Sequence, residues 1–340
     1  MAETTLSTQS APQIVRRAGM FRGRDRAIKI FIAATVIPMV LYMAFWSLFP
    51  ILWGFSLSLF EYSARRAGAG GFLGMGGANP YVGLQHYRAM LDFSSEAPKI
   101  VKQFHQSLKT TLLFAFLVVP LNLIITLPLA VMLDSIHRRL QPFFRTFFFL
   151  PIVTASVGVA IMWGFIYHPQ LGLLNGILTA ISGKMVAIQW LGDPHLKVLG
   201  VPVALLAVIA AYLWQDIGYN TLIFIAALQN IPQSLRDAAK VDGVNSLQMF
   251  WHVTIPLLRP TILLAAVLTM ISAFQVFDII QVMTNGGPQD QTRVLVIDIY
   301  YNAFRFQRMG WASAVAVVLF FLVLVISLIQ TRLLRTEWEY

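Results

Sequence analysis

The sequence predicts an all-α membrane protein with six transmembrane helices and both termini in the cytoplasm. Of the 340 residues, 57% are hydrophobic and only 12% are charged, and the mean hydropathy is +0.69. That mixture is too apolar for a soluble protein of this length. Six long runs are also nearly free of charge, and each is close to the length that crosses a hydrocarbon layer of about 30 Å. The six predicted spans are residues 30–60, 110–133, 146–167, 198–215 continuing past Asp216 to 235, 261–277 and 309–331.

The basic residues predict the orientation of these spans. With the N-terminus inside, fourteen of the 25 Lys and Arg residues lie in the cytoplasm, on the shorter total length of loop. Residues 1–29 form a basic cytoplasmic tail, and the apolar run that follows is too long for a secretory signal, so we expect an uncleaved first span over 30–60. The net charge of +10 then reflects topology and contact with lipid headgroups. It does not indicate nucleic-acid binding, because the basic residues are spread over separate loops.

The rest of the chain divides in order along this topology. Residues 61–107 are predicted to form an outer loop, and 108–332 a core with five spans. Residues 333–340 are a cytoplasmic tail. The apolar stretch 171–181 is too short to span and is expected to form an interfacial helix at the outer face. With no cysteine, the chain has no disulfide and no thiolate metal site.

Residues 231–260 interrupt the apolar runs with a polar stretch that is not built like a flexible linker. Ser234 followed by Asp237 is typical of a capped helix start. The helix is expected to end at Gly243, where glycine readily adopts a positive φ. A second amphipathic turn follows, and Pro256 precedes the next span. Two short helices at a membrane surface form a shape suited to docking into a groove of another protein.

This stretch resembles the cytoplasmic coupling loop of the membrane subunits of binding-protein-dependent ABC importers. Asp237-Ala238-Ala239, Gly243 and the sequence Val-Thr-Ile-Pro ending at Pro256 keep that family's spacing, with Asp for Glu, Val for Ile and Ile for Leu. The residues that the resemblance assigns to ATPase coupling are Asp237, Ala238, Ala239, Asp242, Gly243 and Pro256. Residues 81–87 and 276–288, the latter ending in Gly286-Gly287-Pro288, resemble two outer elements of the same family. The turn at 286–288 is either a contact for the binding protein or a plain tight turn.

The resemblance covers about residues 31–332 and is to the first permease subunit of maltose-, trehalose- and glycerol-3-phosphate-type systems. Within that group the chain looks more like the six-span subunits of the glycerol-3-phosphate and trehalose types, since it lacks the additional N-terminal spans and the large outer domain of the enterobacterial maltose permease. It implies an inner-membrane subunit that works by alternating access. The implied partners are a second homologous permease, an ATP-binding-cassette ATPase dimer and an extracytoplasmic sugar-binding protein. The chain lacks a phosphate-binding GxxxxGK[ST] loop, so ATP and Mg²⁺ would be bound by the partner ATPase. No cofactor, metal site or catalytic group is expected in this chain.

Polar side chains at mid-membrane depth are costly unless they are paired or face water, which makes them candidates for substrate binding. The candidates are Asn122 in the second span, Gln215, Asp216, Tyr219 and Asn220 in the fourth, and Gln275, Asp278 and Gln281 in or just after the fifth. Amides and carboxylates beside aromatic rings suit a neutral sugar. Since the presumed pathway has Asp216 and Asp278 but no Lys or Arg inside a span, an anionic substrate is disfavoured. We therefore expect a neutral di- or oligosaccharide.

Two alternatives stay open at this point. The same polar groups are the ones that bond helices to each other, and for Asn220, Gln275 and Asp278 the substrate-binding and interhelical roles are equally compatible with the sequence. Asp216 favours the site, since no intramembrane cation is available to pair with it. The alternative function is an ion-coupled secondary transporter of a polar solute, with Asp216 and Asp278 as its ion-linked carboxylates, but the 231–260 loop has no role there.

Overall fold

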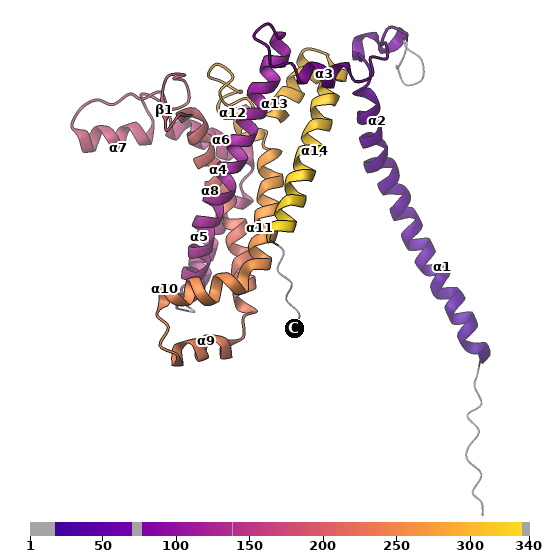
Figure 1. The fold of residues 1–340 in the computed structure, drawn as a ribbon. Coiled ribbons are helices and arrows are strands. Elements are labelled where there is room, and N and C mark those ends of the chain that lie inside the picture. The colour runs from indigo at the N-terminus through magenta and orange to yellow at the C-terminus, as the bar shows by residue number, and fades with distance from the viewer. Residues whose placement is uncertain (1–17, 70–76, 138, 335–340) are drawn as a thin grey trace, which may run out of the picture. The chain divides into compact units, whose positions relative to one another are not determined.

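The computed structural model describes residues 18–69, 77–137 and 139–334, and these residues are mainly helical (Figure 1). A backbone inside hydrocarbon must satisfy its N–H and C=O groups internally, which is why the apolar runs are helical. In this described part of the chain, five helices are long and apolar enough to cross a membrane, or six if one bent pair counts as a single span. Helical structure and multiple membrane-spanning segments are thereby confirmed.

The chain divides into two compact units, residues 1–54 and 55–340, which are described separately. In the first unit, helix α1 (Ala18–Met43) passes through a π-helical turn, η1 (Ala44–Leu48), into α2 (Phe49–Leu57), which continues into the second unit. Together they give the candidate span Arg26–Leu57. This span covers most of the predicted range 30–60.

The second unit begins with short elements and then a long helix. A 3₁₀ turn, η2 (Ala64–Ala69), and α3 (Gln85–Met90) precede α4 (Lys99–Ser135). Helix α4 runs unbroken through Pro120 and Pro128. It begins well before the predicted span start at residue 110, and its first turns carry lysines beside the buried apolar residues Val101 and Phe104.

The third predicted span is broken. Helices α5 (Gln141–Val153) and α6 (Ser156–Ile166) meet at an angle of 99°. Helix α7 (Leu173–Ser182) matches the predicted short helix 171–181 and ends at Gly183, which has φ +65°. A two-stranded antiparallel hairpin, β1 (Lys197–Val198) and β2 (Val201–Pro202), comes next, with Lys197 opposite Pro202.

The predicted start of the fourth span at residue 198 is wrong, because residues 197–202 form this hairpin. Helix α8 begins only after Pro202, which is its N-cap, and covers Val203–Gln229. Helix α9 (Gln233–Val241) lies in the 231–260 loop. Then α10 (Ser246–Gln248), the π-helical turn η4 (Met249–Thr254) and α11 (Ile255–Phe274) follow without a break. The remaining elements are α12 (Asp278–Met283), α13 (Leu295–Tyr300), the π-helical turn η5 (Tyr301–Arg305) and α14 (Met309–Leu334).

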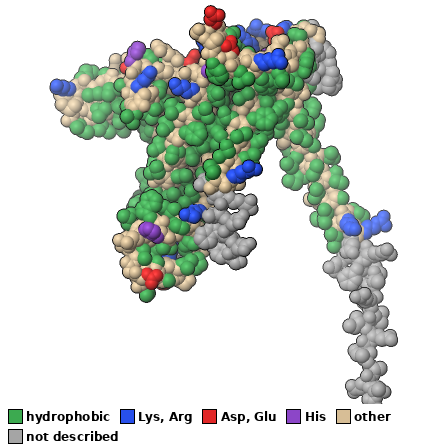
Figure 2. Space-filling view, in the orientation of Figure 1, with side chains coloured by type: hydrophobic (Ala, Val, Ile, Leu, Met, Phe, Trp, Pro, Cys, Tyr) green, Lys and Arg blue, Asp and Glu red, His purple; other side chains and the backbone are tan. Residues whose placement is uncertain are grey.

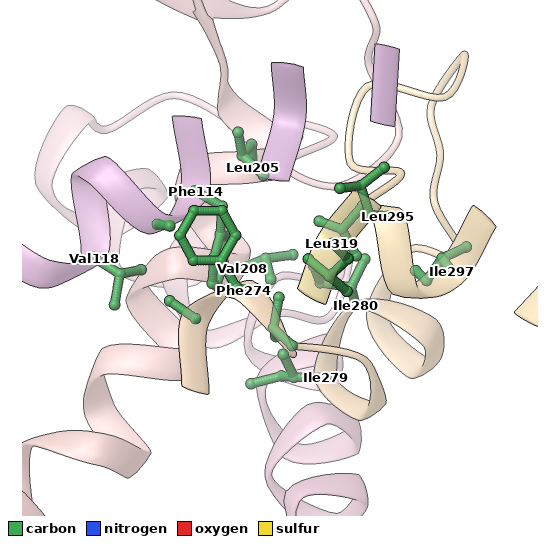
Figure 3. Close-up of a cluster of buried hydrophobic side chains, with 14 of the residues drawn as sticks. Phe114, Val118, Leu205, Val208, Phe274, Ile279, Ile280, Leu295, Ile297 and Leu319 are labelled. Carbon is green, nitrogen blue, oxygen red and sulfur yellow. The ribbon is translucent and has the colours of Figure 1, made fainter. Parts of the chain in front are cut away.

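The core of the second unit lies where α4 packs along α8 and α11, and where α14 packs on α11 and α13. Phe114 of α4 and Phe274 of α11 are fully buried there, with Ile280 and Leu295 beside them (Figure 3). A second apolar cluster, which includes Leu133 of α4, lies towards the 231–260 loop. Around the middle of the bundle the visible surface is hydrophobic, and charged side chains gather at its ends (Figure 2). That distribution is typical of a protein that lies across a bilayer.

Candidate functional site

A polar network joins three helices in the interior of the bundle. Asn122 on α4 donates a hydrogen bond from Nδ2 to Oδ2 of Asp216 on α8, at 2.8 Å. Asn220, one turn further along α8, donates from Nδ2 to Asn122 Oδ1 and to Thr269 Oγ1 on α11, both at 2.7 Å. Asn122 and Asn220 are completely buried, whereas Asp216 is half-buried. In this structure the two amides therefore link helices, which is the interhelical role left open for Asn220.

Gln215 and Gly218 hold α8 against the break between α5 and α6. Gln215 donates from Nε2 to the Thr154 carbonyl oxygen at 2.9 Å and to Ser156 Oγ at 3.3 Å. Carbonyls at a helix end lack an intrahelical partner, so this side chain satisfies one of them. At Gly218, a Cβ would lie 2.6 Å from the Phe148 carbonyl oxygen of α5. The absence of a side chain there lets the two helices approach closely.

Tyr219 lies on another side of α8. It is 42% exposed and forms no hydrogen bond within the described part of the chain, so it does not join the buried network. Trp214 is 38% exposed and lines an apolar cavity of about 480 Å³ between α4, α5 and α8. The aromatic and amide side chains of α8 thus face different surroundings.

The fifth span ends at a second break. Helix α11 ends at Phe274, Gln275 is its C-cap, and Asp278 begins α12. The side chains of Gln275 and Asp278 are exposed. Gln281 instead donates from Nε2 to Asn285 Oδ1 at 2.6 Å, in the following loop. Because α12 packs against α6, the segments that follow the two breaks contact each other. An exposed amide and an exposed carboxylate beside a helix break are free to hydrogen-bond a polar solute.

The 231–260 loop lies at one end of the bundle, opposite α3, α12 and α13, and contains α9 (Figure 1). The predicted Ser234–Asp237 cap is wrong, since α9 begins after Pro232 and has no side-chain cap. Pro232 has no N–H to donate to a preceding helical turn, and its fixed φ suits the start of α9. Asp237 instead accepts a hydrogen bond from Gln233 Nε2 at 2.9 Å. Asp237 and Ala238 are exposed, and Ala239 is buried.

Helix α9 ends as the sequence predicts. Gly243 has φ +77°, in the left-handed region that favours glycine, so the expected positive φ is confirmed. Its N–H donates to the Lys240 carbonyl oxygen and the Val244 N–H to the Ala239 carbonyl oxygen, each at 3.1 Å. These two bonds form a Schellman motif. Asp242 is the exposed C-cap that precedes the glycine.

The second half of the loop joins the fifth span directly. Asn245 and Gln248 form a reciprocal capping box with distances of 2.8 and 2.9 Å, a signal that the sequence contained and our prediction missed. Pro256 lies half-buried at the start of α11, just after the π-helical turn η4. The expected separate second helix is therefore the first part of one continuous helical run, Ser246–Phe274.

Arg236 ties α9 to two spans. Its Nη1 lies 3.3 Å from Asp134 Oδ2 at the end of α4, and its Nη2 donates to the Leu228 carbonyl oxygen at the end of α8, at 2.8 Å. The two charged side chains are 29% and 18% exposed. This contact was not predicted, because Asp134 and Arg236 are far apart in the sequence. It places α4 in direct contact with the loop.

At the opposite end of the bundle, a buried ion pair supports the loop after α12. Arg293 Nη2 lies 2.6 Å from Asp298 Oδ1, with side chains 4% and 0% exposed. Burial raises the pKa of the Asp298 carboxyl, and the adjacent Arg293 guanidinium opposes that rise. The predicted turn at 286–288 precedes this pair, and Thr292 Oγ1 donates to the Gly287 carbonyl oxygen at 2.6 Å. This bond closes the turn on the later part of its own loop. Among the residues that the structure describes, no three His, Cys, Asp or Glu side chains gather as metal ligands.

The chain matches known proteins over most of its length. Residues 126–337 match the family described as "Binding-protein-dependent transport system inner membrane component". The chain is 33% identical over 305 residues to "Probable ABC transporter permease protein YurN" of Bacillus subtilis, covering 89% of this chain and 96% of that protein. It is 32% identical to an "sn-glycerol-3-phosphate transport system permease protein UgpA" of Agrobacterium fabrum, covering 85% and 90% of the two chains. It is 37% identical over 231 residues to "Lactose transport system permease protein LacF" of Rhizobium radiobacter, covering 67% and 74%.

Solved structures share the fold. A bacterial ABC transporter involved in the import of the acidic polysaccharide alginate has a chain that superposes with a TM-score of 0.73 at 22% identity, covering 92% of this chain and 97% of that one. The alginate transporter in complex with an alginate pentasaccharide-bound periplasmic protein gives a TM-score of 0.74 at 21% identity. At this level of identity the similarity concerns the arrangement of helices.

Proposed function

Since the chain belongs to the family of binding-protein-dependent transport system inner membrane components, we propose that it is a permease subunit of an ATP-driven ABC importer that moves a sugar inward by alternating access. Its partners in this proposal are a second, homologous permease, an ATPase dimer that binds ATP and Mg²⁺, and an extracytoplasmic sugar-binding protein. The 231–260 loop and both chain termini then lie in the cytoplasm.

The observation that carries this proposal is the exposed apolar surface of the 231–260 loop. Val241 is 88% exposed, Leu247 68% and Trp251 58%, around a helix whose Asp237 and Ala238 also face outwards. Val241 ends α9, whereas Leu247 lies on α10 and Trp251 on η4, so the exposed apolar side chains extend over both halves of the loop. An exposed apolar surface of this kind is typical of a segment that docks into a groove. Because the chain belongs to this transporter family, we infer that the partner docked on the loop is the ATPase dimer.

The contacts of this chain suggest how the loop moves the spans. Arg236 links α9 to α4 and α8, and α10 runs without interruption into α11. These three helices are the ones joined by Asn122, Asn220 and Thr269 in the bundle interior. A displacement of α9 therefore acts on α4, α8 and α11. Alternating access requires that these helices can pack in two different arrangements, one open to each side of the membrane.

We assign the substrate contacts to the surface beside the two helix breaks. Gln275 and Asp278 are exposed there and can hydrogen-bond hydroxyl groups, while Asp216 is half-buried at the edge of the network. Relatives named for the transport of lactose, a sugar, and of sn-glycerol-3-phosphate, a polyol phosphate, support a carbohydrate or a polyol derivative. Because the spans of this chain supply carboxylates and no cation at mid-depth, a neutral di- or oligosaccharide is our preferred substrate.

The experiment is reconstitution of the complete complex into proteoliposomes with its binding protein. We expect uptake of a labelled sugar that requires ATP on the side of the 231–260 loop and the binding protein on the other. Uptake driven by a proton or sodium gradient without ATP would favour the secondary-transporter alternative. A screen in which only phosphorylated or carboxylated ligands stimulate the ATPase would overturn the neutral-substrate proposal and leave the importer proposal intact.

A further inference from the structure

A polar cavity of about 480 Å³ lies at the end of the bundle opposite the 231–260 loop. Its walls come from the first turns of α4, the β1–β2 hairpin with the start of α8, and the loop after α12. The charged side chains that line it are Lys99, Lys102, Lys109, Lys197 and Asp290. We call this cavity the lysine recess. No substrate contact proposed above lies in it.

The positive charge of the lysine recess is not balanced within the described part of the chain. None of its four lysines has a carboxylate within ion-pairing distance there. Asp290 is already engaged, because Arg293 Nη1 lies 3.4 Å from its Oδ1 and Gln103 Nε2 donates to its Oδ2 at 3.3 Å. Four like charges around one cavity repel each other and are stabilised when an anionic surface binds.

The spacing of the lysines indicates the size of the anionic partner. Lys99, Lys102 and Lys109 are three and seven residues apart, so they follow one face of α4, and at 1.5 Å per residue they extend over about 15 Å. One carboxylate or phosphate would contact both ends of such a row only if both lysine side chains extended fully towards it. A folded surface with several acidic side chains can contact both ends without that extension. The four lysines are exposed and Thr110 and Leu205 of the lining are buried, so the cavity is open to a partner and has a closed floor.

We propose that the lysine recess receives a cluster of acidic side chains on the extracytoplasmic binding protein and so steers and holds that protein on this subunit. This inference rests on the proposed function, which places the recess on the outer side. Exposed charge pairs of this kind raise the association rate and fix orientation, and they weaken as salt screens them. The amides of Gln103 and Gln106 in the lining donate to Asp290 and to Thr110, and an amide NH2 carries a second N–H that suits a carboxylate.

The test uses the full complex in nanodiscs of zwitterionic lipid and titrates the binding protein that stimulates its ATPase. Because two charge reversals remove attraction and add repulsion, K99E/K102E is expected to weaken binding by about tenfold in about 50 mM KCl, and by less than about twofold in about 1 M KCl. The milder K99Q/K102Q variant should lose about threefold at low salt and guards against a folding defect. The matched control is K184E, an exposed lysine after α7 that is outside the recess.

Each outcome decides the inference. Equal affinities of wild type, K99E/K102E and K184E, with normal stimulation of ATPase activity, would overturn the recess proposal while the importer function stands. So would lysine-dependent binding of free inorganic phosphate or glucuronate with unchanged docking, since the recess would then be a small-anion site. If no binding protein stimulates the wild-type complex at all, the proposed function itself is wrong, which is a different result.

Discussion

Removing the contact between Arg236 and Asp134 should uncouple ATP hydrolysis from transport. Asp134→Ala deletes the ion pair at 3.3 Å and leaves the bond from Arg236 to the Leu228 carbonyl oxygen. Arg236→Ala deletes both. The pair is 18% and 29% exposed, so its contribution lies between that of a surface pair and that of a buried one. We expect a loss of about 1–2 kcal/mol for Asp134→Ala and more for Arg236→Ala.

The assay measures sugar imported per ATP hydrolysed in proteoliposomes. If the contact transmits motion from α9 to α4, a loss of 1–2 kcal/mol corresponds to about a five- to thirtyfold fall in the coupling between nucleotide state and substrate release. ATP hydrolysis should continue, since no ATPase residue is changed. Arg139→Ala, which removes an exposed charge at the same end of the bundle, is the matched control and should leave the ratio unchanged.

A reversed pair, Asp134→Arg with Arg236→Asp, separates transmission from simple stability. It restores the attraction between α4 and α9 but not the bond to Leu228, so we expect partial recovery of the transport-to-ATP ratio. If Asp134→Ala or Arg236→Ala keeps the wild-type ratio of sugar imported to ATP hydrolysed, whatever its thermal stability, this contact has no role in coupling.

Three further predictions concern two glycines and two amide side chains. Gly243→Val should abolish transport and stimulated ATPase activity while the protein still inserts, because a β-branched residue resists φ +77°. The control Gly243→Asn should retain more of both activities. Wild-type uptake by the valine variant would contradict the loop assignment. Gly218→Val should lower the melting temperature of the complex, since its Cβ would lie 2.6 Å from the Phe148 carbonyl oxygen. Asn220→Ala should destabilise assembly by about 1–3 kcal/mol, because the buried Asn220 links three helices. Gln275 is exposed, so Gln275→Ala should impair uptake with normal thermal stability. If Asn220→Ala impaired only uptake and Gln275→Ala destabilised assembly, Asn220 would be the substrate contact and Gln275 the interhelical link.

Local signals were the ones that the sequence analysis could use. The Schellman end of α9 was predictable because Gly243 terminates a short amphipathic pattern, and the spans were predictable because charge is excluded from them. The Asn245–Gln248 box was equally local and was overlooked. The hairpin before α8 was hidden by its apolar composition, although Gly200 and Pro202 were available as breaking signals.

Tertiary contacts explain what sequence analysis could not predict. At the break between α5 and α6, the distant residue Gln215 bonds the Thr154 carbonyl, and no periodic pattern reveals such a bond. In the sequence Thr269 is one small residue of an apolar helix, and its role becomes clear only from its hydrogen bond to Asn220 in the structure. Polarity identified Asn122 and Asp216, but whether a polar group faces a ligand or another helix depends on packing that only the structure shows.

The two interrupted helices also bear on how the protein is made. Each interruption leaves peptide groups at a helix end within an apolar part of the chain, between Val153 and Ser156 and between Phe274 and Asp278. Lipid cannot hydrate such groups, so they require cover from protein or from water held by protein. Gln215 of α8 supplies this cover for the Thr154 carbonyl within the same chain. A newly made copy therefore leaves that peptide group uncovered until α8 has inserted and packed against the break, so we expect copies that stall before α8 to be short-lived in the cell.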